Sequence, residues 1–366
     1  MSSFSEPGGG TGAAATNKAE GASRLLVEGS VVDINSYFYE QGWTDGLPII
    51  PPTEDLVLEM IEACMLPANR VLGRMPPLNG TVTAEKIAIN TVMAGCKPDY
   101  MPVVMAAVKA VLQPQFNVGS ITTTTGGAAP VVIVSGPIAS QLGIHGGTAV
   151  FGSGHQANAT IGRALRLTMR NLGGAKADTM EKSTQGWPGK YTMCFAENNE
   201  ANPWEPLHVE LGYPAEVSTV TVSAARGIHT MVEATQETGE GVLETLVSSM
   251  TAGGISGYSY QARGASPVVV LGPEHAAEIA AAGFGRKDVK EYLFQRVRIP
   301  LGQLKERGHW GSRSWPEEWE NYGDADAVPL VADPEQFLLV VAGGDGRHSS
   351  WFPAWSATQR ATEIIQ

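Results

Sequence analysis

Two histidines in a glycine-rich segment are the first candidates for chemistry. The segment GIHGGTAVFGSGHQANAT, residues 143–160, lies between a strand-like run and a helical one and contains His145 and His155. Two imidazoles can bind a metal ion or act as a base and its partner, although this spacing matches no recognised metal motif. Loop histidines that only bond backbone groups are the alternative. We interpret 143–160 as the site loop, because sites commonly form at the carboxyl ends of strands.

The start of the helix after this loop is a candidate anion site. Asn158, Thr160 and Arg163 lie in its first turns. Free backbone N–H groups and the helix dipole favour negative charge there, and an arginine one turn further can hold a carboxylate or phosphate with two hydrogen bonds. In the competing interpretation, Asn158 or Thr160 is a plain helix cap and Arg163 is solvated.

An acidic segment supplies a third candidate histidine. AENNEANPWEPLHVE, residues 196–210, places His208 among carboxylates that include Glu197 and Glu210. A carboxylate can orient an imidazole and raise its basicity, which suits general base catalysis or metal binding. Solvated loop acids are the alternative.

A glycine loop before the strand-like run is a further candidate ligand site. TTTTGG, residues 122–127, offers Thr124, Thr125 and Gly126 as ligand-binding residues. Successive backbone amides in such a turn can bind an oxyanion. A turn that only marks the start of the strand explains the loop equally well.

A second glycine loop, AGGDGR, occupies residues 342–347. Gly344 and Arg347 are its candidate ligand-binding residues, and His348, which follows, is a further candidate for proton transfer. Neither glycine loop matches GxxxxGK[ST] or GxGxxG, and the chain has no GxSxG motif. ATP binding, dinucleotide binding and an α/β-hydrolase mechanism are therefore disfavoured.

Three cysteines are present, and Cys96 is the candidate for reactivity. It lies where a helical run ends before Pro98, with Lys97 beside it. The lysine would lower the thiol pKa and the helix C-terminus would raise it, so its reactivity stays open. Cys194 and Cys64 lie in apolar patterns that predict burial.

The elements that position these residues form a degenerate repeat. AAPVVIVSGP at 128–137 recurs as ASPVVVLGP at 265–273, and TVTA at 81–84 recurs as TVTV at 219–222. A helical pattern precedes each strand-like run, at 102–112 and 241–250, and another follows it, at 161–174 and 288–302. We predict an α/β fold of two pseudo-repeated helix-strand-helix halves packed around a mixed sheet. Chance similarity of two VVV–GP runs is the alternative.

These patterns divide the chain into four regions. We expect a disordered tail at 1–29, a first α/β half at 30–215 that carries the site loop, and a second half at 216–308. The remainder, 309–366, reads as a tryptophan-rich linker followed by a strand and glycine loop, FLLVVAGGDGRHSS at 337–350, which completes the sheet or bridges the halves.

Composition limits the partners. A net charge of −12 disfavours a phosphate-backbone footprint, so we expect no nucleic acid partner. No apolar run is long enough to span a membrane, and the N-terminal residues lack the apolar core of a secretion signal. The odd cysteine number fits reduced thiols rather than a disulfide framework. We expect a cytoplasmic homo-oligomer.

From DGLPIIPPT at 45–53 to about residue 350, the sequence resembles a bacterial family associated with UGSC-motif selenoproteins and thiol proteins. The resemblance rests on TAEKIAINTVMAGCKPDYMPVV (83–104), ANATIGRALRL (157–167), AENNEANPWEPLHVE (196–210), VVVLGPEHA (268–276) and VVAGGDGRHS (340–349). The chain lacks a Cys-Gly-Ser-Cys sequence. The resemblance therefore implies the large component that accompanies a separate thiol or selenol protein, and redox chemistry is implied only by that association.

Our leading hypothesis is a small-molecule enzyme that acts on a small anionic or polar metabolite through redox or carbon–heteroatom bond chemistry, as an oxidoreductase or a lyase. Arg163 and the helix start would hold the anion, one histidine would transfer protons, and Glu197 or Glu210 would orient it. The alternatives are a non-catalytic ligand-binding or partner subunit and a metal-dependent hydrolase or lyase. The cofactor and any metal are left unknown.

Overall fold

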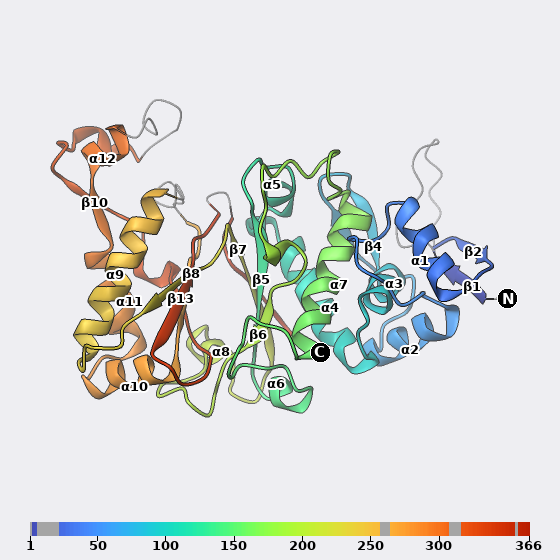
Figure 1. Ribbon diagram of the computed structural model, residues 1–366, viewed down its shortest axis with the longest axis horizontal. Coiled ribbons are helices and arrows are strands. Elements are labelled where there is room, and N and C mark those ends of the chain that lie inside the picture. Colours follow the sequence, from blue (N-terminus) through green and yellow to red (C-terminus); the bar gives the residue numbers. More distant parts are fainter. Residues whose placement is uncertain (1, 6–21, 257–263, 307–315, 356–357) are drawn as a thin grey trace.

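A computed structural model describes residues 2–5, 22–256, 264–306, 316–355 and 358–366. Its longest-range strand pairings form two four-stranded sheets, ordered β14-β7-β5-β6 and β12-β9-β13-β8 (Figure 1). The strands of the first sheet are β5 (Ala129–Ser135), β6 (Cys194–Ala196), β7 (Thr219–Ala225) and β14 (Ala361–Ile364). Those of the second are β8 (His229–Val232), β9 (Val268–Leu271), β12 (Leu338–Val341) and β13 (His348–Phe352).

Both sheets are mixed and have the same sequence of orientations. β5 pairs parallel with β6 and antiparallel with β7, and β14 pairs antiparallel with β7. In the second sheet, β9 pairs parallel with β12 and antiparallel with β13, and β8 pairs antiparallel with β13. The edge strands cross over: β8 follows β7 in the chain but joins the second sheet, whereas β14 follows β13 and joins the first. The α/β class is confirmed, while the duplication stays a prediction.

The expectation of one mixed sheet is wrong, because two sheets pack face to face. Along β5, Val131 and Ile133 contact the other sheet, while Val132 and Val134 face helices. This alternation follows from the two-residue period of a strand. Both faces of the strand are covered, which explains its continuous apolar sequence.

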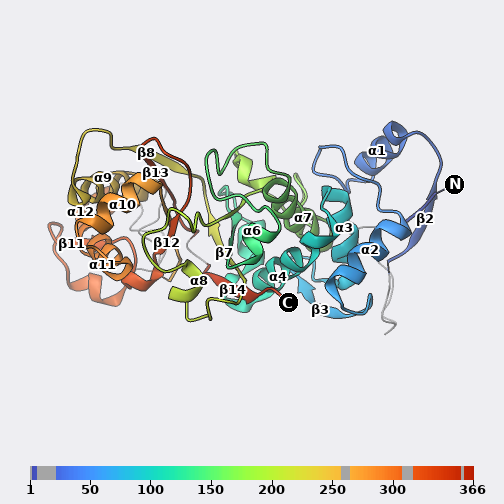
Figure 2. The ribbon, with the colours of Figure 1, turned by 90° about the horizontal axis from the view of Figure 1, so that it is seen from below.

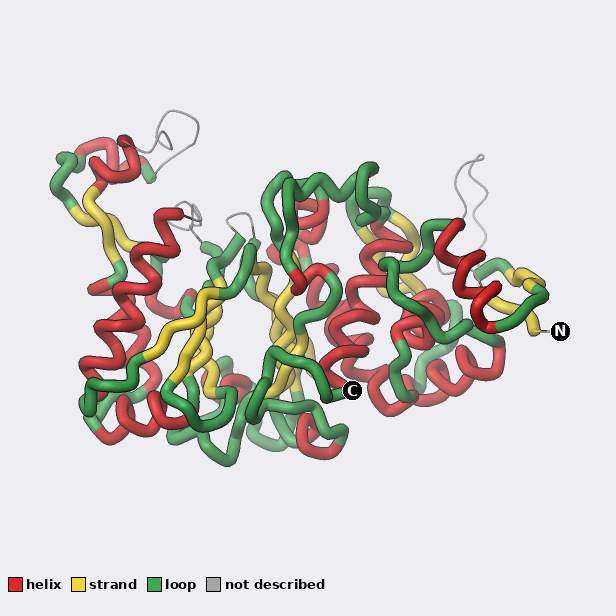
Figure 3. The backbone as a smooth tube through the Cα atoms, viewed as in Figure 1, coloured by secondary structure: helices red, strands yellow, loops and turns green. Residues whose placement is uncertain are grey.

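Helices cover the outer faces and make four layers, helix, sheet, sheet and helix (Figure 3). The first sheet is covered by α4 (Met101–Leu112) and α7 (Gln156–Gly173), and α3 (Ala84–Ala94) packs against these two helices. The second is covered by α9 (Gly239–Ser256), α10 (Pro273–Ala281) and α11 (Arg286–Arg296). Shorter helices are α5 (Val118–Thr122), α6 (Ile138–Gln141), α8 (Leu207–Glu210) and α12 (Leu301–Glu306).

The predicted helices are confirmed, with one difference in extent. The pattern over 288–302 was expected to be one helix, but α11 ends at Arg296 and β10 (Arg298–Pro300) follows. Pro300 explains the break, since proline disfavours helical backbone at the residue before it and cannot donate a hydrogen bond. β10 pairs with β11 (Ala327–Pro329).

One predicted boundary and one predicted repeat match differ from the strand pairing. β7, which a boundary at 216 assigns to the second half, belongs to the first sheet with β5. The TVTA segment at 81–84 ends β4 (Gly80–Thr83), which pairs with β3 (Val71–Met75), so it is not structurally equivalent to 219–222 in β7. The strand and glycine loop at 337–350 were expected to complete the sheet or to bridge the halves. They supply β12 and β13 to the second sheet and lead to β14 in the first.

The N-terminal region projects from the end of the layered body (Figure 2). Residues 2–5 and 24–27, within the predicted disordered tail 1–29, form the antiparallel strands β1 (Ser2–Ser5) and β2 (Arg24–Val27). Residues 1 and 6–21 of that tail lie outside the described residues. Two helices follow, α1 (Val31–Glu40), capped by Ser30, and α2 (Glu54–Cys64), capped by Thr53.

The predicted linker 309–327 is described only from residue 316. Trp319 is buried in the second-sheet core, as is Trp351, while Trp310 and Trp315 lie outside the described residues. No helix in the described part of the chain is long and apolar enough to cross a membrane.

Candidate functional site

Three loops predicted to carry chemistry meet at the carboxyl ends of β5, β6 and β12. The Ala196 amide donates to the His145 carbonyl at 3.1 Å, and the Gly343 amide donates to the Gly146 carbonyl at 2.8 Å. The Asn198 side-chain amide joins the acidic segment to the second glycine loop by donating to the Gly343 carbonyl at 3.1 Å. The site loop, the acidic segment and the second glycine loop therefore form one junction at the seam between the two sheets.

Two glycines allow this close approach. A Cβ atom at Gly146 would lie 2.5 Å from the Ala196 carbonyl oxygen. A Cβ atom at Gly344 would overlap the Thr148 hydroxyl of the site loop. Gly344 thus lies in the junction, where it lets the two loops pack, and its predicted ligand-binding role stays a prediction.

His145 and His155 stack on one another. Their ring centroids lie 3.5 Å apart and the rings are 5° from parallel, and both residues are half-buried. His145 Nε2 lies 2.8 Å from the Thr148 carbonyl, which can only accept, so the neutral ring carries its proton on Nε2. Its Nδ1, and both ring nitrogens of His155, have no hydrogen-bond partner among the described residues.

Asn158 fixes the backbone of the first histidine. Its Oδ1 accepts from the His145 amide at 2.7 Å, and its Nδ2 donates to the His145 carbonyl at 2.9 Å. The side chain is buried, on the first turn of α7. Asn158 therefore positions His145 and is not free to bind a ligand, and the helix cap is His155, with no side-chain cap bond.

Thr160 and Arg163 do not form the predicted anion site. The Thr160 hydroxyl donates to the Gln156 carbonyl one turn back at 2.8 Å. The Arg163 guanidinium holds both carboxylate oxygens of Asp45 at 2.8 Å and donates to the Pro48 carbonyl at 2.9 Å. Its donors are consumed in fastening the DGLP segment to α7, which sequence spacing could not show, because Asp45 lies 118 residues away.

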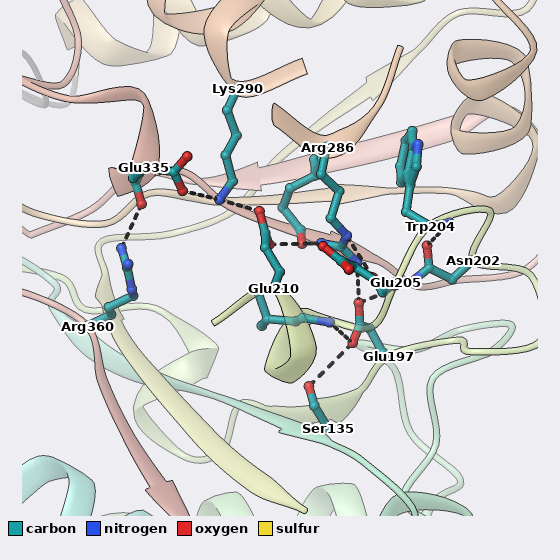
Figure 4. A network of polar contacts seen from close by, with 12 residues as sticks. Ser135, Glu197, Asn202, Trp204, Glu205, Glu210, Arg286, Lys290, Glu335 and Arg360 are labelled. Carbon is teal, nitrogen blue, oxygen red and sulfur yellow. Dashed lines mark hydrogen bonds and ion pairs between the residues drawn. The ribbon is translucent and has the colours of Figure 1, made fainter. Parts of the chain in front are cut away.

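The two candidate carboxylates of the acidic segment belong to a buried ion network (Figure 4). Glu197 accepts from Arg286 at 2.7 Å and from the Leu207 amide at 2.8 Å. Glu210 pairs with Lys290 at 2.5 Å and lies 3.4 Å from Arg286. Burial raises the pKa of Glu197, and the Arg286 guanidinium opposes part of that rise.

This network fastens the two sheets and orients no histidine. Arg286 and Lys290 lie in the first turns of α11, which covers the second sheet, whereas Glu197 and Glu210 follow β6 of the first sheet. His208 is buried, and its Nε2 lies 3.3 Å from the Ala215 carbonyl. In the described structure it bonds neither carboxylate, so the predicted Glu–His pair is wrong. No motif marked Arg286, which the sequence analysis missed.

The loop with Thr124, Thr125 and Gly126 lies at the opposite end of β5. The seven residues of β5 separate it from the histidine loop by roughly 20 Å. Its groups are bonded locally: Gly126 donates to Thr124 Oγ1 at 2.9 Å, and Thr184 donates to the Thr125 carbonyl at 2.9 Å. These three residues are not brought to the junction.

Arg347 and His348 have local partners. The Arg347 guanidinium pairs with Glu278 and donates to the Glu233 carbonyl at 2.9 Å, so it is not free to bind a ligand. His348 is exposed, and its Nδ1 contacts the Gly346 carbonyl.

A buried serine–histidine pair was missed. The hydroxyl of Ser349 lies 2.8 Å from His275 Nδ1, and His275 Nε2 faces the Glu233 carbonyl at 3.1 Å. Both side chains are fully buried, and burial lowers the pKa of His275. The pair therefore ties β13 to α10. Only a motif joining positions 74 residues apart could have revealed it.

Cys96 is not an activated thiol. Desolvation raises its pKa to about 12, although the Thr160 hydroxyl and the Arg163 charge act in the opposite direction. Burial also raises the pKa of Cys194, and Cys64 is half-buried with its thiol 3.2 Å from the Ile61 carbonyl. The described residues contain no group of three His, Cys, Asp or Glu side chains placed to hold a metal ion.

Comparison with known proteins adds no assignment: no protein-family model matches the sequence, and no curated protein matches it significantly. The chain is a mixed α/β protein of two packed sheets with a histidine pair at their seam.

Proposed function

We propose that this chain is a small-molecule enzyme whose site is the junction of the loops after β5, β6 and β12. The observation that carries the proposal is the stacked pair His145 and His155, ten residues apart and 3.5 Å between centroids. The free Nδ1 of His145 can accept a proton, and His155 has two nitrogens open to a ligand. Because the rings are stacked, their in-plane nitrogens point to the surroundings and not to each other, so one ring can exchange a proton with a substrate that the other ring binds.

The start of α7 supports a small anionic or polar substrate. His155 is the N-cap, and the amides of the first turn have no acceptor within the helix. These amides would take the role first given to Arg163, because they lie beside the histidine and the helix dipole favours negative charge there. The substrate anion would then sit next to the ring that exchanges a proton with it.

The reaction class follows from the family resemblance. Redox or carbon–heteroatom chemistry, as an oxidoreductase or a lyase, can use a histidine that transfers a proton. The raised pKa values of the half-buried Cys96 and the buried Cys194 leave neither available as a thiolate. If the reaction uses a thiol, a separate thiol or selenol protein would supply it. A homo-oligomer and a cytoplasmic location stay predictions from the sequence.

A non-catalytic binding or partner subunit is the second candidate. It is favoured by the internal bonds of Arg163, Arg347, Glu197 and Glu210, which leave few charged groups free. The metal-dependent hydrolase or lyase gains no support, since no three-ligand group occurs among the described side chains.

Metabolite profiling tests the proposal. The purified full chain is incubated with a bacterial small-molecule extract, with and without an added dithiol, and compared with His145→Asn, His155→Asn and the control His229→Asn, an exposed histidine of β8. We expect one substrate and product pair to change with the wild type and the control and at least ~100-fold more slowly with either site variant. Full turnover by both folded site variants would contradict the site. A metabolite that binds without changing would favour the second candidate.

A further inference from the structure

We infer that Arg170 and Lys176, at the end of α7, form a binding site for a phosphate group, carried by free phosphate or by a small phosphate monoester. The inference is independent of the histidine site. Gln156 begins α7 beside His155, and the length of the helix from Gln156 to Arg170 places the two sites roughly 20 Å apart. The inference rests on two cations without a partner and on the charges around them.

Arg170 is the arginine of α7 that lacks a carboxylate. Three arginines follow one face of this helix, at positions 163, 166 and 170. Arg163 holds Asp45 at 2.8 Å, and Arg166 lies 4.0 Å from Glu181. Within the described residues, the side chain of Arg170 forms no hydrogen bond or ion pair, and its Nε is buried without a partner.

Lys176 is a second cation without a partner. It follows the glycines that end α7, is half-buried, and forms no side-chain hydrogen bond or ion pair in the part of the chain that the structure describes. Burial lowers the pKa of both side chains, and the charge of Arg170 lowers that of Lys176 further, so the two cations lie close enough to repel each other. Two partly desolvated like charges are unfavourable without a counter-ion, and a bound anion would supply one.

The end of the helix does not occupy these donors. The helix dipole favours positive charge in the last turn. The carbonyls of Met169 and Arg170, however, already accept from the amides of Ala175 and Gly174 at 3.4 and 3.0 Å. The terminal nitrogens of Arg170 and Lys176 are not fully buried, so they are open to a ligand.

The surrounding charge selects a dianion. Asp45 is the carboxylate whose charge acts on Arg170, but both of its oxygens already bond Arg163 at 2.8 Å. Glu40, exposed on α1, pairs with neither cation in the described structure. Two positive charges remain, which a phosphate group of charge about −1.5 to −2 near pH 7 neutralises and a single carboxylate does not. A guanidinium can hold two phosphate oxygens, and an ammonium group can hold a third.

Gly42 leaves space for the ligand beside Lys176. A Cβ atom at Gly42 would lie 3.6 Å from Lys176 Nζ and would meet no other atom within 4 Å outside the adjoining residues. The φ of Gly42 is 67°, in the left-handed region that aspartate and asparagine also adopt. Gly42→Asp therefore places a carboxylate against Lys176, where the phosphate is proposed to bind, and Gly42→Asn is the uncharged control of the same shape.

Isothermal titration calorimetry of the full-length protein, near pH 7.5 and at constant ionic strength, tests the inference with inorganic phosphate, phenyl phosphate and acetate. We expect both phosphates to bind at least ~10-fold more tightly than acetate. Tighter binding of phenyl phosphate would identify a monoester as the ligand, and equal or weaker binding would identify free phosphate.

Matched variants locate the binding. Arg170→Gln with Lys176→Gln should weaken phosphate binding at least ~10-fold, whereas Arg70→Gln with Lys109→Gln, an arginine and a lysine that line a different groove, should leave it unchanged. Gly42→Asp should bind phosphate at least ~10-fold more weakly than Gly42→Asn. Circular dichroism checks that each variant is folded.

Three results would overturn the inference. The first is absent phosphate binding, or acetate binding as tight as that of phosphate. The second is equal weakening by the two double variants, which would make the effect one of net charge. The third is binding that His155→Asn abolishes and Arg170→Gln with Lys176→Gln preserves, which would place the phosphate at the start of α7.

Discussion

Replacing Arg286 by methionine should destabilise the chain strongly, because it isolates a buried carboxylate. The side chain of Arg286 is 3% exposed and that of Glu197 is fully buried, with 2.7 Å between them. Removing one partner of such a pair costs about 3–5 kcal/mol of unfolding free energy. At about 2.1 cal/mol/K per residue, the unfolding entropy of 366 residues is roughly 0.8 kcal/mol/K, so we expect Tm to fall by roughly 4–7 °C.

The sign of the pH dependence follows from Glu197. Its pKa in the folded chain is raised by burial, and loss of the Arg286 charge would raise it further. A carboxyl group whose folded-state pKa is raised stabilises the fold below its ordinary value of 4.5 and loses that contribution as pH rises through the folded-state value. We therefore expect the deficit of Arg286→Met to be smaller near pH 5 than near pH 8.

Differential scanning fluorimetry and urea unfolding at the two pH values measure both effects. Arg296→Met is the matched control, because Arg296 pairs with Glu244 at the surface with side chains 55% and 43% exposed, where such a pair contributes less than about 1 kcal/mol. Glu197→Gln combined with Arg286→Met should recover part of the loss. Equal midpoints for Arg286→Met and Arg296→Met, or a larger deficit at pH 5, would refute the reasoning.

Three further outcomes follow from the site. Asn158→Ala removes two hydrogen bonds to His145. We expect urea unfolding to show a loss of about 1–3 kcal/mol in unfolding free energy, and the turnover rate to fall roughly 10-fold. An unchanged turnover rate would show that Asn158 is not needed to position His145. Cys96, with its pKa raised to about 12, should resist iodoacetamide at pH 8 until the chain unfolds, and mass spectrometry finding rapid labelling of the folded chain would contradict this raised pKa. Gly344→Val should separate the glycine loop from the site loop and lower Tm, because a Cβ at this position overlaps Thr148. Gly343→Ala is the control: its Cβ would meet open space, so it tests only the strain of a positive φ in a residue other than glycine.

Local sequence patterns predicted the elements better than their assembly. The strand-like runs ending in Gly-Pro became β5 and β9, because their apolar, β-branched composition needs burial on both faces. The two separate sheets and the exchange of β8 and β14 between them could not be predicted, since strand pairing joins residues far apart in the chain. Ile364 and Thr219, for example, are paired across the sequence in the first sheet.

The histidine loop was placed correctly relative to the strands, but the charged residues were not. His145 and His155 meet because their loop folds back on itself beside α7, which the sequence analysis did not predict. Arg163 and Glu197 looked free in sequence because their partners, Asp45 and Arg286, are 118 and 89 residues away. A buried charge must find a partner, yet nothing in a local pattern says which one.

We propose that His145 and His155 act as one proton-transfer unit. The most direct test is the turnover rate of His145→Asn, His155→Asn and the double variant on whichever metabolite the wild type converts. Residues that act as a unit are strongly non-additive, so we expect the double variant to be no more than about 3-fold slower than the slower single variant. A double variant slowed by the product of the two single effects would show that the histidines act independently and would contradict the claim.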